Sequence, residues 1–390
     1  RRDEVVVRVL GVDAGLDRVA ADREVLLRER QLLAGGDPDH RLHDVDARDH
    51  LGDRVLHLHA GVHLEEVEAV VLVDQELAGP GADIVHGPRR GDGGLAHLRP
   101  QLGADAVARR LLDHLLVAAL HRAVAFAEMD DVEMAGLCDL VEDKLHATAD
   151  KFGIEKRFTS YQKMIEETAP DGVYVLMPPH HLFDIVIDVL NRGLHCYIEK
   201  PPGVMSEQTR QMANLAEAKG VLTMVAFNRR FIPLMQQCKA RVTQVGPLNQ
   251  VVSTFYKWHT GGPYYNGAID ILSCDAVHAV DALRFFGGDV VDCASAVRSL
   301  GKQFDTSFQA LVEFQSGAIG VLLANWQTGG RVHSFELHAP GASAFINPDV
   351  SAVLNINGNL ATETITTQEA AGGRTELYHY YGFSGENRHF

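Results

Sequence analysis

Polar residues that could do chemistry follow a series of short apolar stretches in the middle of the chain. They are Asp139, then Pro178, Pro179 and His180, then Glu199 and Lys200, and then Asn228 and Arg229. In a parallel α/β sheet, ligands bind beyond the carboxyl ends of the strands. We therefore predict that these side chains gather along one binding edge. A carboxylate there can accept hydrogen bonds from ribose hydroxyls, and a lysine there can assist proton transfer.

Two of these residues also have a plainer interpretation. Asp139 could instead cap the helix that begins near Val141, and one residue can do both. A ribose carboxylate would repel a 2′-phosphate, so Asp139 favours NAD over NADP as the cofactor. Lys200 could instead be a solvated surface lysine. In a cleft, desolvation would lower its pKa and help proton transfer.

Strands and helices alternate through residues 127–246, which is the pattern of a parallel sheet. The expected strands are Val132–Cys138, Arg157–Ser160, Gly172–Met177, His195–Ile198 and Val221–Phe227. The expected helices are Glu142–Phe152, Tyr161–Thr168, His181–Asn191 and Glu207–Lys219, the last with Ser206 as its cap. This pattern predicts a Rossmann-like, dinucleotide-binding domain.

Residues 247–390 have a different pattern. Gln250–Trp258 alternates as a strand, and Ile269–Phe286 has the periodicity of one long helix. Short strands follow, and Asn357-Gly358 is a strong hairpin-turn signal. We expect an α+β domain with a mostly antiparallel sheet, one face of which docks on the first domain.

Several strings in these two segments resemble the Gfo/Idh/MocA family of oxidoreductases, which act on sugars and cyclitols. They are Leu-Cys-Asp139, Asp171-Gly-Val-Tyr-Val-Leu-Met-Pro-Pro179-His, Tyr-Ile-Glu199-Lys200-Pro201-Pro202 and Phe227-Asn-Arg-Arg-Phe231. The resemblance covers about residues 128–390. It implies that Lys200 lies near the nicotinamide and the substrate hydroxyl, and that Glu199 contributes to the cofactor site.

The resemblance also points to the long helix of the second domain. His278 matches a family histidine that acts as an acid or base, although a helix-packing role is the alternative. Many family members carry an aspartate four residues earlier, where this chain has Cys274 and places Asp275 one position later. The catalytic candidates are therefore Lys200, His278 and Asp275. Six further residues could line a sugar site or be packing residues: Lys257, Trp258, Asn325, Trp326, Arg331 and His333.

Residues 1–126 form an anomalous segment. Residues 1–125, which precede the seam at Phe126, contain no Lys, Ser, Thr, Asn, Cys, Met, Phe, Tyr or Trp. They contain a single isoleucine, Ile84. Such a segment lacks aromatic core residues and most cap and turn formers. We expect it to be poorly structured or non-native. It stands where the family has its first strand and glycine loop, so the parallel sheet is expected to be incomplete. The family also implies a helix beyond Phe390, so the chain looks truncated at both ends.

Two motifs in the first 125 residues are expected to be decoys. His57, His59 and His63, with Glu65 and Glu66, resemble metal ligands, but histidine is frequent throughout this segment. We therefore expect no metal site. The string from Gly91 to Ala96 matches a dinucleotide fingerprint, but it does not follow an apolar strand.

Composition limits the partners and the setting. A net charge of −16 argues against nucleic acid and anionic membranes, and no apolar run approaches the length that spans a bilayer. The five scattered cysteines indicate reduced thiols in a cytoplasmic protein. Family members often pair through an exposed sheet, which implies a homo-oligomer.

These observations predict an enzyme that transfers hydride between NAD and a hydroxyl-bearing carbon of a sugar, cyclitol or related polyol. Two alternatives remain at this point. One is an inactive fragment or chimeric product that has lost its cofactor loop. The other is a metabolite-binding protein without redox chemistry.

Overall fold

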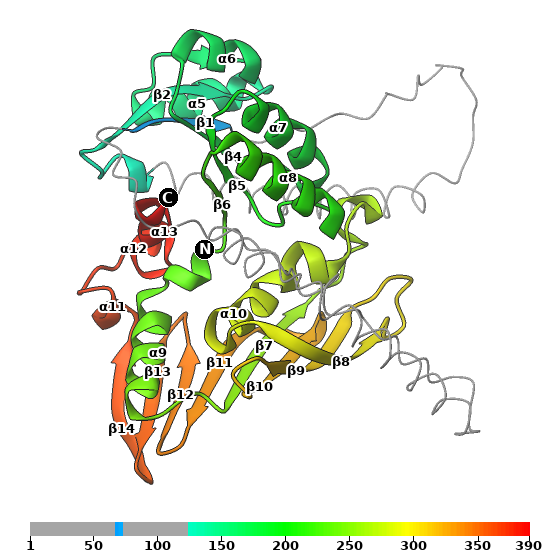
Figure 1. Cartoon of the computed structure of the whole chain (residues 1–390), viewed down its shortest axis with the longest axis vertical. Helices are drawn as coiled ribbons and strands as arrows, with labels where there is room; N and C mark the ends of the chain where they lie inside the picture. The colour runs from blue at the N-terminus through cyan, green and yellow to red at the C-terminus, as the bar shows by residue number, and fades with distance from the viewer. Residues whose placement is uncertain (1–66, 73–123) are drawn as a thin grey trace, which may run out of the picture.

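The computed structural model describes residues 67–72 and 124–390, and it folds them around two sheets (Figure 1). The first sheet has the strand order β3-β2-β1-β4-β5-β6, and all of its strand pairs are parallel. Its strands are β1 (Val67–Leu72), β2 (Val132–Cys138), β3 (Arg157–Phe158), β4 (Gly172–Val175), β5 (His195–Ile198) and β6 (Thr223–Val225). This is the Rossmann order, and its switch point lies between β1 and β4.

The centre of this sheet corrects the expectation of an incomplete one. Val67–Leu72, drawn in blue in Figure 1, lies parallel between β2 and β4. Val70, for example, is in register with Gly136 on one side and Val173 on the other. Its sequence, VEAVVL, is rich in the β-branched residues that suit a strand covered on both faces. A gap here would have left two rows of backbone donors and acceptors unpaired.

Helices cover both faces of the first sheet. They are α5 (Glu142–Phe152), α6 (Tyr161–Thr168), α7 (Pro179–Asn191) and α8 (Ser206–Lys219). Alternate residues of β4 serve the two faces: Val173 and Val175 pack in the core under α6, α7 and α8, and Tyr174 packs in the core beside α5. Residues that face opposite ways along one strand therefore build two separate apolar layers.

Most element boundaries in this domain agree with the sequence prediction. The predicted bounds of β2, α5, α6 and β5 are confirmed. The cap of α8 is a correction, because Ser206 is its first helical residue and Met205 stands at the cap position without a side-chain bond. Helix α6 does have the expected kind of cap, since the Ser160 hydroxyl accepts from the N–H of Lys163.

The second sheet has eight strands in the order β14-β13-β12-β11-β7-β10-β9-β8. Only the β10–β7 pair is parallel, which confirms a mostly antiparallel sheet. The strands are β7 (Gln250–Trp258), β8 (Val290–Arg298), β9 (Ser307–Phe314), β10 (Ile319–Asn325), β11 (Gln327–Ala339), β12 (Ala342–Asn347), β13 (Ser351–Ile356) and β14 (Asn359–Thr366). Asn357 and Gly358 both have positive φ and join β13 to β14, as their sequence predicts.

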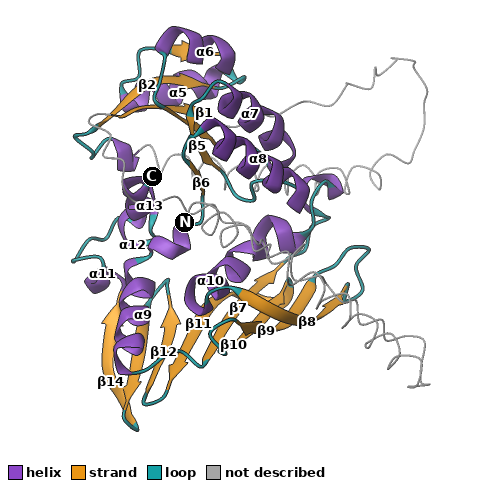
Figure 2. Cartoon of the chain, in the orientation of Figure 1, coloured by secondary structure: helices purple, strands orange, loops and turns teal. Residues whose placement is uncertain are grey.

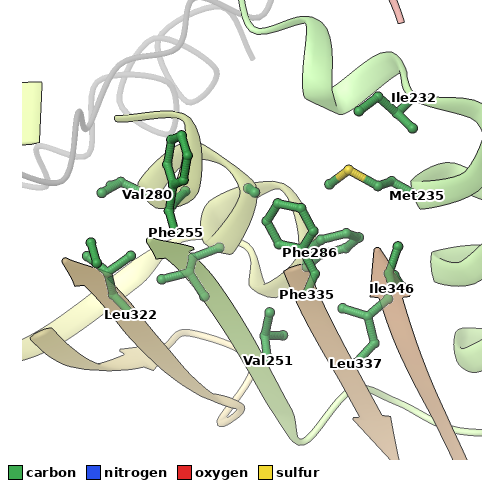
Figure 3. Close-up of a cluster of buried hydrophobic side chains, with 14 of the residues drawn as sticks. Ile232, Met235, Val251, Phe255, Val280, Phe286, Leu322, Phe335, Leu337 and Ile346 are labelled. Carbon is green, nitrogen blue, oxygen red and sulfur yellow. The ribbon is translucent and has the colours of Figure 1, made fainter. Parts of the chain in front are cut away.

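Two helices, α9 (Pro233–Val245) and α10 (Val277–Gly287), pack on one face of this sheet (Figure 2). Figure 3 shows Val280 of α10 near Phe255 and Leu322, and Phe286 of α10 beside Phe335, while Met235 lies on α9 above Ile346. The predicted single helix Ile269–Phe286 is interrupted. A π-helical turn, Leu272–Ala276, precedes α10, and such turns often occur at functional sites.

The end of the chain returns to the first domain. The last helices are α11 (Thr367–Ala370), α12 (Leu377–Tyr380) and α13 (Phe383–His389). Arg388 forms an ion pair with Asp131, and the Phe390 ring lies 5.4 Å from that of Tyr174. Between α12 and α13, a Cβ on Gly382 would lie 2.1 Å from the Asn228 carbonyl oxygen. This close approach, with a φ of 90°, requires glycine.

No helix in residues 124–390 is long and apolar enough to cross a membrane.

The central position of β1 generates a direct test. Val71 lies beyond the register shift at Ala69/Val70 and faces Leu137 on one side and Tyr174 on the other, so Val71→Pro places a residue without an N–H inside a doubly paired strand and should strongly lower the unfolding free energy. The control variant, Val71→Ala, keeps the N–H. Urea unfolding followed by circular dichroism should show a much larger loss for proline than for alanine. Equal losses would contradict the placement of this strand.

Candidate active site

Asp139 lies at the carboxyl end of β2, and its two carboxylate oxygens differ. The backbone N–H of Val141 donates to its Oδ1 at 2.8 Å, while its buried Oδ2 has no hydrogen-bond partner among residues 67–72 and 124–390. Burial raises the pKa of Asp139 to about 6, against the opposing effects of that hydrogen bond and of Lys144. The cap position of α5 belongs to Val141, so Asp139 stabilises the turn before the helix rather than capping it.

The unpartnered oxygen is the feature that fits a cofactor. A buried carboxylate oxygen without a donor is costly, and a ribose hydroxyl is a donor of the right kind. The segment that follows β1, where a phosphate loop would begin, lies outside the described residues. So do the string Gly91–Ala96 and the histidines at 57, 59 and 63.

The next strand end carries the two prolines and His180. Pro178 precedes α7, Pro179 is its first residue, and both are buried. His180 is exposed in the first turn, and its ring lies 5.3 Å from that of Tyr265 in the second domain. Partial desolvation of the ring, with a smaller contribution from His181, lowers the pKa of His180.

Lys200 links the two domains. It follows β5 and the buried Glu199, and its Nζ donates at 2.9 Å to the carbonyl oxygen of Cys274. Cys274 belongs to the π-helical turn, one residue before Asp275 and four before His278. The predicted catalytic candidates from the two domains therefore lie close together.

Asp275 is held by a lysine and a tyrosine. Lys257 Nζ donates to its Oδ2, as does the Tyr264 hydroxyl at 3.1 Å, and Trp326 Nε1 donates to that hydroxyl at 2.9 Å. Burial alone would raise the pKa of Asp275, but the charges of Lys257 and Lys200 and the Lys257 hydrogen bond hold it below its usual value. The carboxylate therefore stays ionised.

His278 is buried in α10, and its Nδ1 has no hydrogen-bond partner in the part of the chain that the structure describes. Burial, followed by the charges of Arg229 and Lys200, lowers the pKa of His278 well below its usual value. The imidazole is therefore neutral and can accept a proton.

In the turn Asn228–Phe231, which follows β6, both arginines bind residues of the second domain. Arg229, expected near the cofactor, donates from Nε to His333 Nδ1 on β11 at 3.2 Å. Arg230 binds the buried carboxylate of Asp281 with distances of 2.7–3.0 Å. The Asn228 amide donates to the carbonyl of Tyr381 at 2.8 Å.

The six proposed sugar-lining residues have different surroundings. Lys257 and His333 join the cluster around Asp275 and Arg229. Trp326 is in the core, whereas Trp258 is 72% exposed. Asn325 and Arg331 bind other residues: the Asn325 side chain accepts from the N–H of Gln327, and Arg331 forms an ion pair with Asp349. Sequence reasoning missed Tyr264 and Tyr381, because only tertiary contacts bring them to the site.

Comparison with known proteins decides the family. A model described as the NAD-binding Rossmann fold of the oxidoreductase family GFO_IDH_MocA matches residues 117–227, and the model of the family's C-terminal domain matches residues 240–344. Together they cover more than half of the chain. This chain belongs to the Gfo/Idh/MocA family.

Relatives within the family differ in cofactor and substrate. D-xylose 1-dehydrogenase (NADP(+)) 2 of Haloferax volcanii is 26% identical over 71% of this chain and 86% of its own length. The scyllo-inositol 2-dehydrogenase (NAD(+)) of Bacillus subtilis is also 26% identical, over 47% of this chain and 56% of its own length. A solved NAD-binding oxidoreductase from Klebsiella pneumoniae shares the fold, with a TM-score of 0.61 at 18% identity over 82% of this chain and 88% of its own.

No group of three or more potential metal ligands occurs in the part of this Gfo/Idh/MocA chain that the structure describes.

The environment of Asp275 predicts a particular pH dependence. Its folded pKa lies below the unfolded value of about 3.9, so its stabilising effect is fully present above that value and is lost only as pH falls further. Asp275→Asn should therefore cost about 3 kcal/mol of unfolding free energy, equally at pH 5 and pH 8. Urea denaturation measures this, with the exposed Asp130→Asn as the control. A cost that changes between pH 5 and 8 would mean that burial outweighs the lysines.

Proposed function

We propose that this chain is a nicotinamide-dependent dehydrogenase acting on a hydroxyl-bearing carbon of a sugar, cyclitol or related polyol. The observation that carries this proposal is the Lys200–Cys274 contact, which brings the strand-end lysine beside the segment that holds Asp275 and His278. The names of relatives as xylose and inositol dehydrogenases support the substrate class.

Asp139 is the residue proposed to select the cofactor. Its unpartnered Oδ2 would accept a ribose hydroxyl, and its charge would repel a 2′-phosphate, so NAD is favoured over NADP. Pro178, Pro179, His180 and Glu199 follow the neighbouring strands and are proposed to line the same site. NAD, when bound, supplies the acceptor or donor of the hydride.

Lys200 and His278 are proposed to handle the proton. As the hydroxyl carbon loses hydride, the oxygen must also lose its proton, and a neutral imidazole is a suitable acceptor. His278, whose Nδ1 has no partner among the described residues, is the residue we assign to this step. The Lys200 ammonium would hold the substrate oxygen and stabilise charge that develops on it. The ionised Asp275 would offset the charges of Lys257 and Lys200.

We also infer a reducing, cytoplasmic setting and a homo-oligomer. All five cysteines are free thiols, and four are buried. Large apolar side chains on several strands of the second sheet are exposed, and such a face suits pairing with another copy. They include Leu311, Ile319, Val332 and Phe345.

The role of Lys200 predicts a split between turnover and binding. Lys200→Met should lower kcat for polyol oxidation at least 100-fold, because it removes the group that assists proton transfer. NADH affinity, measured by fluorescence, should stay close to that of the wild type. The control is Lys163→Met, an exposed lysine on α6. Unchanged turnover in Lys200→Met would refute the assigned role, and loss of NADH binding alone would make it a cofactor residue.

The role of Asp139 predicts a change in cofactor preference. Asp139→Ala should weaken NADH binding about tenfold, because one charged hydrogen-bond acceptor is lost. NADPH binding should weaken less or improve, because the repulsion of its 2′-phosphate disappears. Titrations with both cofactors measure the ratio of the two dissociation constants. An unchanged ratio would contradict ribose recognition by Asp139.

A further inference from the structure

Two adjacent arginines are buried at the domain junction, and within residues 124–390 only Arg230 has an anionic partner. Arg230 binds the Asp281 carboxylate through Nε and Nη2. The hydrogen bonds of Arg229 go to neutral acceptors, His333 Nδ1 at 3.2 Å and Asn228 Oδ1 at 3.5 Å. Among residues 124–390, no carboxylate forms an ion pair with Arg229.

The carboxylates nearest to this guanidinium already serve other cations. Asp275 and Asp349 both influence Arg229 through their charge, but Asp275 pairs with Lys257 and Asp349 pairs with Arg331. The faces of two aromatic rings, each 5.8 Å from the Arg229 guanidinium carbon, give weaker support. A buried cation without an anion is strongly unfavourable, so its retention points to a function.

His333 contributes a donor that lacks an acceptor. Its Nδ1 accepts from Arg229, so the neutral imidazole carries its proton on Nε2. That nitrogen is buried and has no hydrogen-bond partner among the described residues. Burial, followed by the charge of Arg229, lowers the pKa of His333 well below its usual value and keeps the ring neutral.

Several cations surround one of these carboxylates. Arg229, Lys200 and Lys257 all act on Asp275 through their charge, within a chain whose net charge is −16. The cluster reaches solvent at one edge, where the side chain of Lys257 is 28% exposed and that of Asp275 is 18% exposed. A small anion that enters the cluster would meet this positive charge.

We propose that Arg229 binds an oxyanion of the substrate, so that the polyol oxidised here carries a carboxylate or a phosphate. This inference rests on the proposed function and narrows its substrate class. An arginine fork matches the geometry of either group, and binding would supply the anionic partner that residues 124–390 do not provide. His333 would then orient the guanidinium through Nε as a positioning residue.

Matched substrate pairs and matched arginine variants test the proposal. NAD reduction is measured with D-galacturonate against D-galactose, and with D-glucose 6-phosphate against D-glucose. The wild type should favour one anionic member by about tenfold or more in kcat/KM, and the preferred pair identifies the oxyanion. Arg229→Gln should lose this preference and keep its NADH affinity.

Thermal unfolding separates binding from a structural role. Arg229→Gln removes an uncompensated charge, so its Tm should equal or exceed that of the wild type. Arg230→Gln breaks a buried ion pair, so its Tm should fall clearly. A large drop in Tm for Arg229→Gln would overturn the proposal and make the residue structural.

Other results would also overturn it. Better turnover of the neutral sugars by the wild type would refute the anionic substrate while leaving the dehydrogenase intact. Loss of NADH affinity in Arg229→Gln would assign the anion to the cofactor. If NADH does not bind and no sugar is oxidised, the proposed function itself fails. In that case the oxyanion proposal is tested by thermal unfolding with an anionic sugar. A higher Tm for the wild type but not for Arg229→Gln would support the proposal, and equal Tm shifts for the two proteins would reject it.

Discussion

Backbone pairing at the centre of the parallel sheet is the constraint on which the rest of the structure depends. β1 shares its hydrogen bonds with β2 on one side and β4 on the other, so it fixes the spacing of the strands that end at Asp139 and Pro178. An unfilled centre would expose unpaired polar groups on both neighbours. The edge at which the candidate cofactor residues gather exists because a short valine-rich strand completes the sheet.

The turn after β6 shows how one junction can serve stability and function at once. Arg230 and Asp281 form a buried, well-aligned pair that ties the first domain to α10. Arg229, one residue earlier, faces His333 and has no such partner among the described residues. Natural proteins tolerate such local costs where a ligand repays them, so the contrast separates the structural arginine from the one available for binding.

Local sequence signals predicted a large part of the fold. Apolar alternation with flanking polar and glycine residues placed β2, α5, α6, β5 and β7 with correct bounds, and the predicted strand ends did supply the candidate site. β1 was missed because the segment around it lacks most of the turn-forming and capping residues that usually flank a strand. The π-helical turn before α10 was missed because one extra residue in a helical turn does not visibly change the apolar periodicity of the sequence.

Long-range contacts were beyond the reach of sequence reasoning. Lys257 and Asp275 meet only because β7 runs beneath α10, and the partner of Arg229 comes from β11, far along the chain. Asp275, His278 and Asp281 stand three residues apart, a spacing that would place them near one face of an uninterrupted helix. The structure gives them different partners: Asp275 pairs with Lys257 and Asp281 with Arg230, while His278 Nδ1 has no partner among the described residues.

The most direct measurement is a fluorescence titration of the whole 390-residue chain with NADH. If residues 67–72 complete the sheet and Asp139 receives the ribose, binding should be saturable, with one NADH per chain and a micromolar dissociation constant. Absence of binding at millimolar NADH, by a chain shown to be folded, would contradict the account.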